Sequence, residues 1–344
     1  MEISVIIPVY NAERFVAEAV RSALAQPEVR EVLLVEDGSP DGSLAVCEEL
    51  ARADERVRLL RHPGGVNRGA SASRNLGIRS ARMPYVAFLD ADDIYCPGRF
   101  QVDRAVFAAH ADADGVYGAV GVRYDDPEEE ARFKAQFLHE LTTIRYDLAP
   151  EQLFPALVGT AGLLNVGHIS LDAITFRKDG LMRLDRLIRE DLVMSEDTEF
   201  IMRCAYHLRL YPASTREPVT LRRVHPGNRV TRDAHRLRSL ERFRTAMWEW
   251  VSAQVPDRAV QRQVFLELVH ARALTATTLR EKAWVLKAVL RNPRILRRQH
   301  SAQALVAMVF GRGRIGRGVR KVVDAIFAWL WARRGQRSPM REQI

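Results

Sequence analysis

The stretch Tyr85–Asp93, YVAFLDADD, decides the fold. Its apolar first half is typical of a short strand buried in a parallel sheet, and its second half brings Asp90, Asp92 and Asp93 together. Like charges this close cost free energy unless a cation or hydrogen-bond donors offset them. Ligands of open α/β sheets bind at the carboxyl ends of the strands, so the three carboxylates predict a site for a hard divalent cation. The alternative is an acidic turn in which Asp92 or Asp93 caps the next helix.

The segments before this stretch repeat the same alternation of strand and helix. The glycine-rich loop His62–Gly69 leads into a small-residue helix at Ala70–Ala81, while Asn11 and Asp41 stand where helix N-caps are expected. The order βαβαβαβ with short connections predicts an α/β fold with a parallel sheet and right-handed crossovers. The three earlier strands are predicted at Ile3–Val9, Glu31–Val35 and Val57–Leu60.

The segments after the stretch are less regular. We expect a helix that begins at Pro97, because proline suits the first helical position, and one continuous strand over Gly115–Tyr124. A further helix begins after an N-cap at Ser195, and from about Arg232 onward the pattern is helical throughout. The other predicted elements are a mixed-charge helical segment and two strands: Pro127–Leu164, Ile169–Phe176 and Val219–Val224.

The composition is that of a globular protein. A chain of 344 residues with 47% hydrophobic residues corresponds to about two domains with a sizeable core. Cys47, Cys96 and Cys204 are scattered, without the spacing of a metal site or a disulfide framework, which favours a reducing compartment. The first residues read as a strand rather than a signal peptide, and no apolar run reaches the roughly 18–20 residues of a membrane span. We therefore expect a cytoplasmic protein.

The positive charge is confined to one end of the chain. The net charge is +9, yet residues 281–344 contain 15 Lys and Arg against three acidic residues, so the rest of the chain is slightly negative. Within this tail, Val319–Trp331 has a broad apolar helical face flanked by basic residues and is too short to span a bilayer. These features predict an amphipathic helix lying on a membrane surface, with Trp329 and Trp331 at the depth of the headgroups.

Two other interpretations of the tail remain open. The segment is also compatible with a helical subdomain that packs on the catalytic part, or with a dimer helix. Ala302–Phe310 is a second candidate for membrane contact. No motif that reads nucleic acid accompanies the arginines, so we expect no nucleic-acid partner.

Five motifs occur in one order along the chain. Together they resemble family 2 glycosyltransferases, which have the GT-A fold. The resemblance covers Ile3–Asn228 and implies a GT-A catalytic domain over residues 1–230, with a nucleotide-sugar half at about 1–125 and an acceptor half at about 126–230. Residues 231–344 form a basic helical region outside it. The motifs are SVIIPVYN (Ser4–Asn11), VEDGSPDGS (Val35–Ser43), NRGASASRN (Asn67–Asn75), FLDADD (Phe88–Asp93) and SEDTEF (Ser195–Phe200).

The resemblance implies an activity. A sugar would move with inversion from a nucleotide-diphosphate donor, by family habit a UDP-sugar, to a glycan or a lipid-linked acceptor. Mg²⁺ or Mn²⁺ would offset the charge of the diphosphate leaving group. The enzyme would act as a peripheral protein at the cytoplasmic face of the plasma membrane, and the Ala- and Arg-rich composition suggests a bacterial source.

The resemblance also implies positions for the donor. Pro8 and Tyr10 match residues that line the nucleotide base, with Tyr10 placed to stack on it. Asp37 matches a carboxylate that accepts a hydrogen bond from the base. Asn67 lies in the segment near the ribose and diphosphate, and Arg74 matches a phosphate contact.

The remaining matches concern the metal and the chemistry. Asp90 and Asp92 match the DxD pair, with Asp92 the direct metal ligand, and Asp197 of the Glu196-Asp197 pair matches the general base. His225 matches a region where a histidine approaches the metal or the diphosphate in some relatives. The one departure from the commonest pattern is Glu36, where the family often has Asp; the charge is kept.

Each of these residues also has an ordinary structural interpretation. Asp37 before a glycine suits a turn, and Glu196 and Asp197 suit the first turn of any helix. His225 can be a loop residue. His168, which follows Gly167, is a further candidate for lining the acceptor site.

Three other functions compete with the first. A non-catalytic nucleotide-sugar-binding or scaffold protein would keep the fold, but it needs no general base. A dehydrogenase is disfavoured because no GxGxxG follows the first strand. A nucleotidyltransferase would also use carboxylates and a metal, but it attacks phosphorus, so its products differ.

Overall fold

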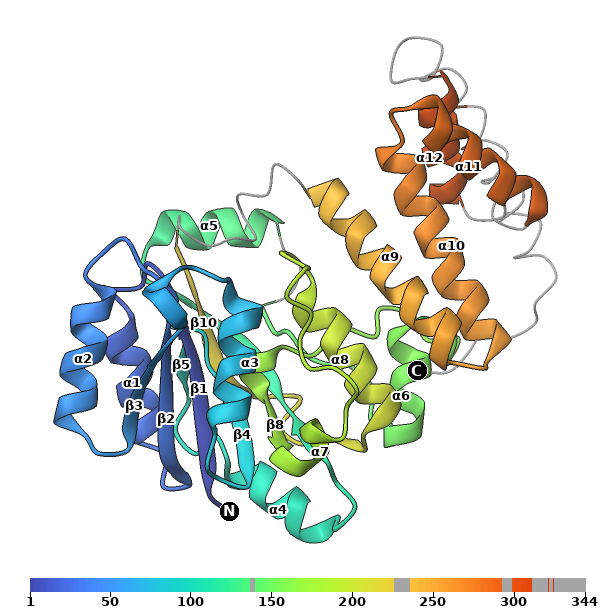
Figure 1. Ribbon diagram of the computed structural model, residues 1–344. Helices are drawn as coiled ribbons and strands as arrows, with labels where there is room; N and C mark the ends of the chain where they lie inside the picture. The colour runs from blue at the N-terminus through green and yellow to red at the C-terminus, as the bar shows by residue number, and fades with distance from the viewer. Residues whose placement is uncertain (137–139, 226–235, 293–298, 311–320, 322–323, 325–344) are drawn as a thin grey trace. The chain divides into compact units, whose positions relative to one another are not determined.

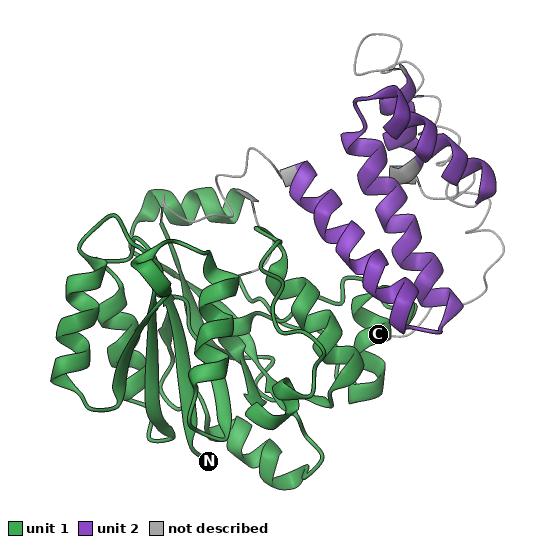
Figure 2. Cartoon of the chain, in the orientation of Figure 1, with its two compact units in different colours: residues 1–234 green, residues 235–344 purple. Residues whose placement is uncertain are grey.

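The computed structural model of the chain describes residues 1–136, 140–225, 236–292 and 299–310, together with Lys321 and Asp324. The chain divides into two compact units, residues 1–234 and 235–344 (Figure 2). Among the described helices, none is both long enough and apolar enough for a bilayer span.

Unit 1 is built on a seven-stranded sheet with the order β3-β2-β1-β4-β8-β6-β9 (Figure 1). Strands β1 to β4 run parallel, as do β6 and β9, whereas β8 is antiparallel to both of its neighbours. The predicted α/β fold with a mostly parallel sheet is thereby confirmed. The strands are β1 (Ile3–Val9), β2 (Val29–Glu36), β3 (Val57–Arg61), β4 (Tyr85–Phe88), β6 (Gly115–Tyr117), β8 (Ile174–Arg177) and β9 (Leu210–Pro212).

Helices cover the two faces of this sheet. Side chains alternate between faces along a strand; the odd-numbered residues of β1 pack in one core with α1 and α2, while α3 lies against the other face. Gly77 of α3 makes this close approach possible, since a Cβ there would lie 2.4 Å from Ile6. The helices are α1 (Val16–Leu24), α2 (Ser43–Ala53), α3 (Ala70–Ser80), α4 (Gln101–Ala109), α5 (Pro127–Gln136), α6 (Pro150–Leu157), α7 (Lys178–Met182) and α8 (Glu196–His207).

A second, three-stranded sheet has the order β5-β10-β7, formed by β5 (Ile94–Tyr95), β10 (Pro218–Val224) and β7 (Ala119–Tyr124). The single strand predicted over Gly115–Tyr124 is therefore wrong. At Gly118 the chain leaves the large sheet: the Gly118 N–H donates to the Ala173 carbonyl, and the Ala119 N–H donates to the Ser214 carbonyl. The small sheet matters for function because β10 lies beside the strand that follows the acidic stretch.

Some predicted helix starts are also wrong. Asn11 has φ +54° and does not cap α1, which begins at Val16. Pro97 does not begin α4, because Gly98 adopts φ +72° and turns the chain before the helix starts at Gln101. Of the predicted helical segment Pro127–Leu164, only α5 and α6 are helical among the described residues.

Unit 2 is helical, as predicted for the C-terminal region. Asp257 caps α10 by accepting hydrogen bonds from two backbone N–H groups, and Thr278 and Glu281 form a capping box at the start of α11. Buried residues of α10, α11 and α12 share one core. The helices are α9 (Arg236–Gln254), α10 (Arg258–Thr275), α11 (Leu279–Arg291) and α12 (Gln299–Phe310).

The structure bears on the two predicted membrane segments differently. Ala302–Phe310 belongs to α12, whose Leu305 and Met308 are buried against the core of unit 2, so this segment packs inward. The predicted anchor Val319–Trp331, including Trp329 and Trp331, lies outside the described residues apart from Lys321 and Asp324.

Candidate active site

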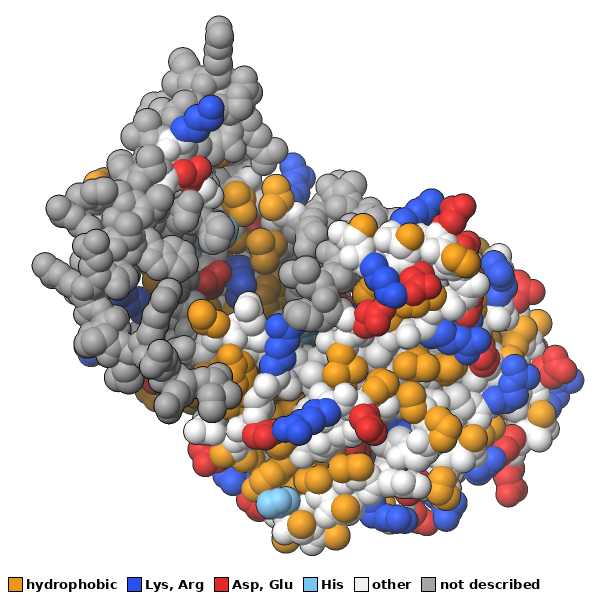
Figure 3. Space-filling model, turned by 180° about the vertical axis from the view of Figure 1, so that it is seen from behind, with side chains coloured by type: hydrophobic (Ala, Val, Ile, Leu, Met, Phe, Trp, Pro, Cys, Tyr) orange, Lys and Arg blue, Asp and Glu red, His pale blue; other side chains and the backbone are white. Residues whose placement is uncertain are grey.

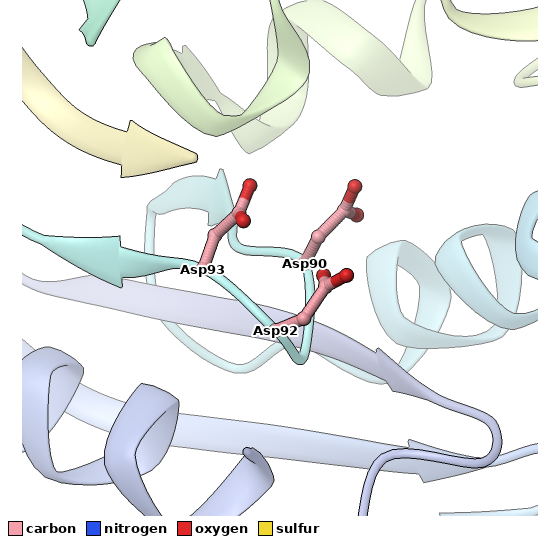
Figure 4. Close-up of side chains that lie close together, drawn as sticks. All are labelled: Asp90, Asp92 and Asp93. Carbon is pink, nitrogen blue, oxygen red and sulfur yellow. The ribbon is translucent and has the colours of Figure 1, made fainter. Parts of the chain in front are cut away.

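The acidic turn, residues 90–93, follows β4 at the carboxyl edge of the sheet. One oxygen from each of Asp90, Asp92 and Asp93 lies within 4.8 Å of the others, and the three side chains lie on the same side of the turn (Figure 4). Asp90 and Asp92 are partly exposed, whereas Asp93 is buried. The turn thus has two accessible carboxylates and one inner carboxylate.

The inner carboxylate has a second acidic neighbour. Asp172, in the short turn Leu171–Ala173 before β8, is buried and accepts a hydrogen bond from the Asp90 N–H at 3.0 Å through its Oδ1. Burial and the carboxylates of Asp172, Asp92 and Asp90 raise the pKa of Asp93 well above its ordinary value. Burial and the neighbouring Asp90 raise the pKa of Asp172 to about 7. Four carboxyl groups therefore gather here, and a cation bound beside them would favour the ionised form of the two buried ones.

Arg223 of β10 clamps the acidic turn. Its backbone N–H donates to Asp93 Oδ1 at 2.9 Å, and its Nε donates to the Asp92 carbonyl at 3.1 Å. The two terminal nitrogens of this buried guanidinium bond the carboxylates of Glu18 and Asp125. One side chain thus fixes the turn to α1 and to the loop after β7.

His225 lies two residues beyond Arg223, on the same face of the extended chain. Its Nε2 is 3.0 Å from Asp92 Oδ2, and its ring lies against Phe15, with 4.9 Å between the ring centroids. The histidine is thereby held beside the carboxylate predicted to bind the metal.

Arg74 of α3 joins the acidic turn to the start of α8. Its Nη2 donates to Asp90 Oδ1 at 2.6 Å, and its Nη1 lies 3.8 Å from Glu196 Oε1. Burial by itself would lower the pKa of Arg74, but the carboxylates of Asp90, Glu196 and Asp172 raise it above its ordinary value. The guanidinium is buried, and its Nε and Nη1 have no hydrogen-bond partner among the described residues. The expected phosphate contact of Arg74 stays a prediction.

Asp197 stands in the first turn of α8 and is partly exposed. Its Oδ1 accepts from the Thr198 N–H at 2.7 Å and lies 3.4 Å from the Thr198 hydroxyl. Desolvation lowers the pKa of His168; the Asp197 carboxylate opposes this shift, and Arg222 and Arg145 add to it. His168 and Asp197 are therefore electrostatic neighbours.

The approach to α8 is held by buried polar contacts. Arg203 pairs with Glu199 at 2.8 Å and donates to the carbonyls of Arg186 and Leu187, both at 2.6 Å. Ser195, predicted to cap α8, occupies the cap position with φ +62°, but its side chain makes no capping hydrogen bond. The preceding loop, rather than a side-chain cap, therefore positions the start of α8, in which Asp197 is the second residue.

The residues predicted for the base lie at the ends of β1 and β2. Tyr10 is exposed and Pro8 partly so. Asp37 is buried, and its two oxygens accept from the backbone N–H groups of Arg68 and Gly69 at 2.7 and 2.8 Å. This carboxylate therefore holds the glycine-rich loop to the end of the sheet.

The same loop packs closely on Gly38. A Cβ at this position would lie 2.8 Å from the backbone nitrogen of Asn67, and Gly38 has φ +69°. Glycine is therefore required on both grounds. Asn67 itself is exposed, and its neighbour Arg68 supplies one of the two donors to Asp37.

A surface pocket of about 450 Å³ lies in the second half of unit 1. The Tyr146 hydroxyl, on one wall, donates to the Leu164 carbonyl at 2.7 Å. Ile144 forms an isolated antiparallel bridge with Gly167, the residue immediately before His168. The pocket thus lies next to the segment that leads to His168. Its lining residues are Tyr146, Asp147, Leu148, Glu151, Gln152, Pro155, Ala161 and Leu163.

The acidic turn fits a divalent metal ion. Its groups are carboxylate oxygens, the ligands that Mg²⁺ and Mn²⁺ prefer. An ion held by the two accessible carboxylates would also be open to phosphate oxygens of a ligand. Asp92 and Asp90 are the residues that would hold the ion, with His225 beside Asp92.

Two residues of this site are absent from the sequence prediction. Asp172 is the single acidic residue inside the apolar stretch Ile169–Phe176, and a charge in such a run is itself a signal. Arg223 belongs to the basic pair at the end of Val219–Val224. The sequence does not show what either residue contacts, because the partners are distant along the chain. Arg223, for example, lies about 130 residues from the turn it clamps.

The chain is similar to known glycosyltransferases in sequence. Residues 4–169 match the model described as Glycosyl transferase family 2. The uncharacterized glycosyltransferase EpsJ of Bacillus subtilis is 40% identical over 100 residues, covering 29% of this chain and 28% of that protein. The succinoglycan biosynthesis protein ExoU of Rhizobium meliloti is 35% identical over 130 residues, covering 35% of this chain and 37% of that protein. The match thus spans about a third of these relatives.

Solved structures share the fold over nearly the whole chain. S. aureus TarS 1-349 in complex with UDP-GlcNAc has a TM-score of 0.61 at 16% identity, covering 95% of this chain and 91% of that one. The mannosyltransferase PcManGT of Pyrobaculum calidifontis, in complex with GDP-Man and Mn²⁺, has a TM-score of 0.50 at 17% identity, covering 95% and 87%. At this identity the likeness establishes the fold.

Proposed function

Since residues 4–169 of this chain belong to glycosyl transferase family 2, we propose that the protein transfers a sugar from a nucleotide-diphosphate donor, a UDP-sugar by family habit, to an acceptor hydroxyl group. The observation that carries the proposal is one connected set of side chains at the carboxyl edge of the sheet. Arg74 links Asp90 of the acidic turn to Glu196, which directly precedes Asp197. Metal-binding and base functions thus have candidates in adjoining positions.

The donor nucleotide is proposed to bind at the ends of β1 and β2. Tyr10 is exposed and offers its ring for stacking on the base, with Pro8 beside it in the sequence. Each carboxylate oxygen of Asp37 can accept a second hydrogen bond, which allows one from the base in addition to those from the loop. Asn67 in that loop is proposed to face the ribose and diphosphate.

The acidic turn is proposed to receive the diphosphate together with Mg²⁺ or Mn²⁺. A bound divalent ion supplies charge neutralisation for the departing nucleoside diphosphate. Asp92 and Asp90 would hold it, while His225 orients the Asp92 carboxylate and Arg223 fixes the turn beneath both. Arg74 adds a permanent positive charge next to Asp90.

Asp197 is proposed as the general base. The acceptor oxygen forms its bond to the anomeric carbon as the bond from that carbon to the diphosphate oxygen breaks, and the hydroxyl proton passes to Asp197. The Thr198 contacts engage Oδ1, so Oδ2 is the oxygen proposed to take the proton. A single displacement of this kind inverts the configuration. His168 is proposed to contact the acceptor beside Asp197.

The acceptor is proposed to be a glycan or a lipid-linked glycan at the cytoplasmic face of the plasma membrane. Relatives include proteins named for the biosynthesis of succinoglycan and of minor teichoic acid, which supports a glycan-type acceptor. The bound ligands of the structural neighbours are UDP, UDP-GlcNAc and GDP-Man, which supports a nucleotide-sugar as donor.

The products of the reaction test the proposal. We would incubate the protein with UDP-, GDP- and dTDP-sugars, Mn²⁺ and a lipid extract, and identify the nucleotide released. We expect a nucleoside diphosphate, with release lowered by at least about 100-fold in Asp197→Asn and also reduced in Asp92→Asn. Release of a nucleoside monophosphate or pyrophosphate would indicate attack at phosphorus. Binding of a donor without release of any nucleotide would indicate a binding or scaffold protein that keeps the fold.

A further inference from the structure

The outer face of α11 is apolar although it is exposed. Val285 and Ala288 of this helix are buried in the core of unit 2. On the opposite side, Leu279, Leu286 and Leu290 are 87%, 44% and 81% exposed. With Ala283, also exposed, they are spaced four, three and four residues apart, which aligns them in one stripe along the helix. We refer to these four residues as the α11 stripe.

Basic side chains border the α11 stripe on both sides. At 100° per residue, Lys282 lies along one edge, and Arg280, Lys287 and Arg291 lie along the other. In the described part of the chain, no salt bridge engages any of these four side chains. The face therefore combines an apolar centre with an uncompensated positive rim.

The one acidic residue of α11 is directed away from this face. Glu281 lies on the core-facing side of the helix by its position in the turn. Its carboxylate accepts hydrogen bonds from the backbone N–H groups of Thr277 and Thr278 at 2.8 and 2.9 Å, as part of the capping box. The exposed face thus has no negative charge that would repel an anionic surface.

The α11 stripe differs from the other exposed apolar residues among those described. Most of these stand singly on separate elements, for example Val102 on α4 and Met182 on α7, as is normal for protein surfaces. On the face of the molecule seen in Figure 3, charged side chains of both signs are interspersed with hydrophobic ones over unit 1. Only α11, among the described helices, aligns three exposed leucines.

We propose that α11 binds the surface of an anionic phospholipid bilayer, lying in its plane. A helix of 13 residues is about 20 Å long, too short to span, and an apolar stripe with a basic rim is the pattern of helices that bury one face at the headgroup boundary. The rim matches anionic headgroups, and residues 281–344 have an excess of 12 positive charges. Lipid is favoured over a second copy of the chain because two such rims would repel each other.

This inference names the surface behind the membrane contact of the proposed function, and in that sense it rests on that function. It uses described residues rather than the Val319–Trp331 segment. Because α11 lies outside the part of the chain that matches the family, lipid binding and donor binding are separately measurable, and either can fail alone.

The test is vesicle flotation with the full chain. Vesicles of phosphatidylcholine alone are compared with vesicles in which about one lipid in three is the anionic phosphatidylglycerol. The test variant is Leu286→Gln/Leu290→Gln, and the matched control is Val102→Gln/Met182→Gln, which removes two comparably exposed apolar side chains from unit 1. We expect wild type and control to float only with anionic vesicles, and the α11 variant to bind at least about tenfold more weakly.

A charge variant examines the rim. Lys282→Ala/Lys287→Ala should weaken binding by about 25-fold, at about fivefold per residue, and added salt should weaken wild type in the same direction. Circular dichroism and donor-induced thermal shifts unchanged from wild type would show that the variants fold. The proposal would be overturned if the wild-type protein did not bind anionic vesicles. It would also be overturned if the α11 variant bound them as strongly as the wild type. Conversion of a dimer to a monomer by that variant, with lipid binding unchanged, would identify the stripe as a dimer interface.

Discussion

The acidic turn and the start of α8 carry the two groups of carboxylates in the site, and they are built differently. The turn is tied from several directions: Arg223 and Asp172 bond its backbone and its inner carboxylate, Arg74 bonds Asp90, and His225 bonds Asp92. Asp197, in contrast, bonds only the adjacent Thr198 in the described part of the chain.

The difference in how the two groups are held agrees with the two functions proposed for them, binding of a metal and acceptance of a proton. A group that holds a metal and a diphosphate gains from being fixed before the ligand arrives, because no reorganisation is then needed. A general base must keep an oxygen available for the incoming hydroxyl group. The structure has firmly held carboxylates at the acidic turn and an accessible one at Asp197, with Arg74 between them. This contrast supports the proposed division between metal binding and proton transfer. Four substitutions test this division, beginning with the largest expected effect.

Asp197→Asn should lower the rate of transfer by at least about 100-fold, because an amide cannot accept the hydroxyl proton. Donor affinity should stay at the wild-type value, since the donor contacts are proposed to lie elsewhere. Turnover is measured by release of nucleoside diphosphate, and affinity by calorimetry. Asp179→Asn, an exposed acidic residue of α7, is the matched control. Unchanged turnover in Asp197→Asn would remove the base assignment.

Asp92→Asn should weaken the metal-dependent part of donor binding by about 10–100-fold, the range typical of a disturbed metal site. The measurement is a titration of the nucleotide with and without Mn²⁺. Binding without metal should be the same in variant and wild type. Normal Mn²⁺-dependent affinity in Asp92→Asn would refute its assignment as a ligand and leave the acidic turn a structural feature.

Arg223→Gln isolates the clamp on the turn, and Arg123→Gln is its matched control. Both arginines pair with Glu18 and Asp125, but only Arg223 reaches the backbone of the acidic turn. We expect about a tenfold loss of Mn²⁺ affinity in Arg223→Gln, and less than about a twofold change in Arg123→Gln, since exposed pairs contribute little. Equal effects in the two variants would mean that the shared carboxylates matter rather than the clamp.

Arg74→Lys should have the smallest effect, about threefold to tenfold on kcat with little change in KM. A lysine can keep the hydrogen bond to Asp90 but not the planar fork that also places Nη1 3.8 Å from Glu196. The loss of a contact worth about 1 kcal/mol corresponds to that range. The split between kcat and KM is the readout. A rise in KM for the donor alone would indicate instead that Arg74 contacts the phosphates directly, as the sequence resemblance implies.

The sequence was sufficient for the parts of the fold that local patterns encode. Strands β1 to β4 are short apolar runs bounded by turn residues, and the parallel pairing follows from the helices between them. The break at Gly118 is not predictable from the sequence, because residues 115–122 contain no charged side chain to mark it. Only the pairing with Ala173 and Ser214 divides the stretch between two sheets.

The residues of the candidate site likewise include some that local motifs indicate and some that only the tertiary structure reveals. The acidic turn and the start of α8 were recognisable because each is a compact motif. Asp172 and Arg223 were not, since their importance comes from partners distant in the sequence, and a buried carboxylate or arginine looks like any other until its neighbour is known. Arg74 is predicted from the sequence as a phosphate contact, which stays a prediction, whereas its link to Glu196 is visible only in the tertiary structure.

The central claim, that the carboxyl edge of this sheet binds a nucleotide-sugar through a metal at the acidic turn, is tested most directly by thermal shift. Purified protein is heated with UDP-, GDP- or dTDP-sugars, each with and without Mn²⁺, alongside Asp92→Asn. A ligand at 100 times its dissociation constant adds about 2.7 kcal/mol to the free energy of unfolding, which is a readable shift. We expect a thermal shift with one of the nucleotide-sugars, and we expect this shift to depend on Mn²⁺ and on Asp92. A shift of equal size without metal, or in Asp92→Asn, would contradict it.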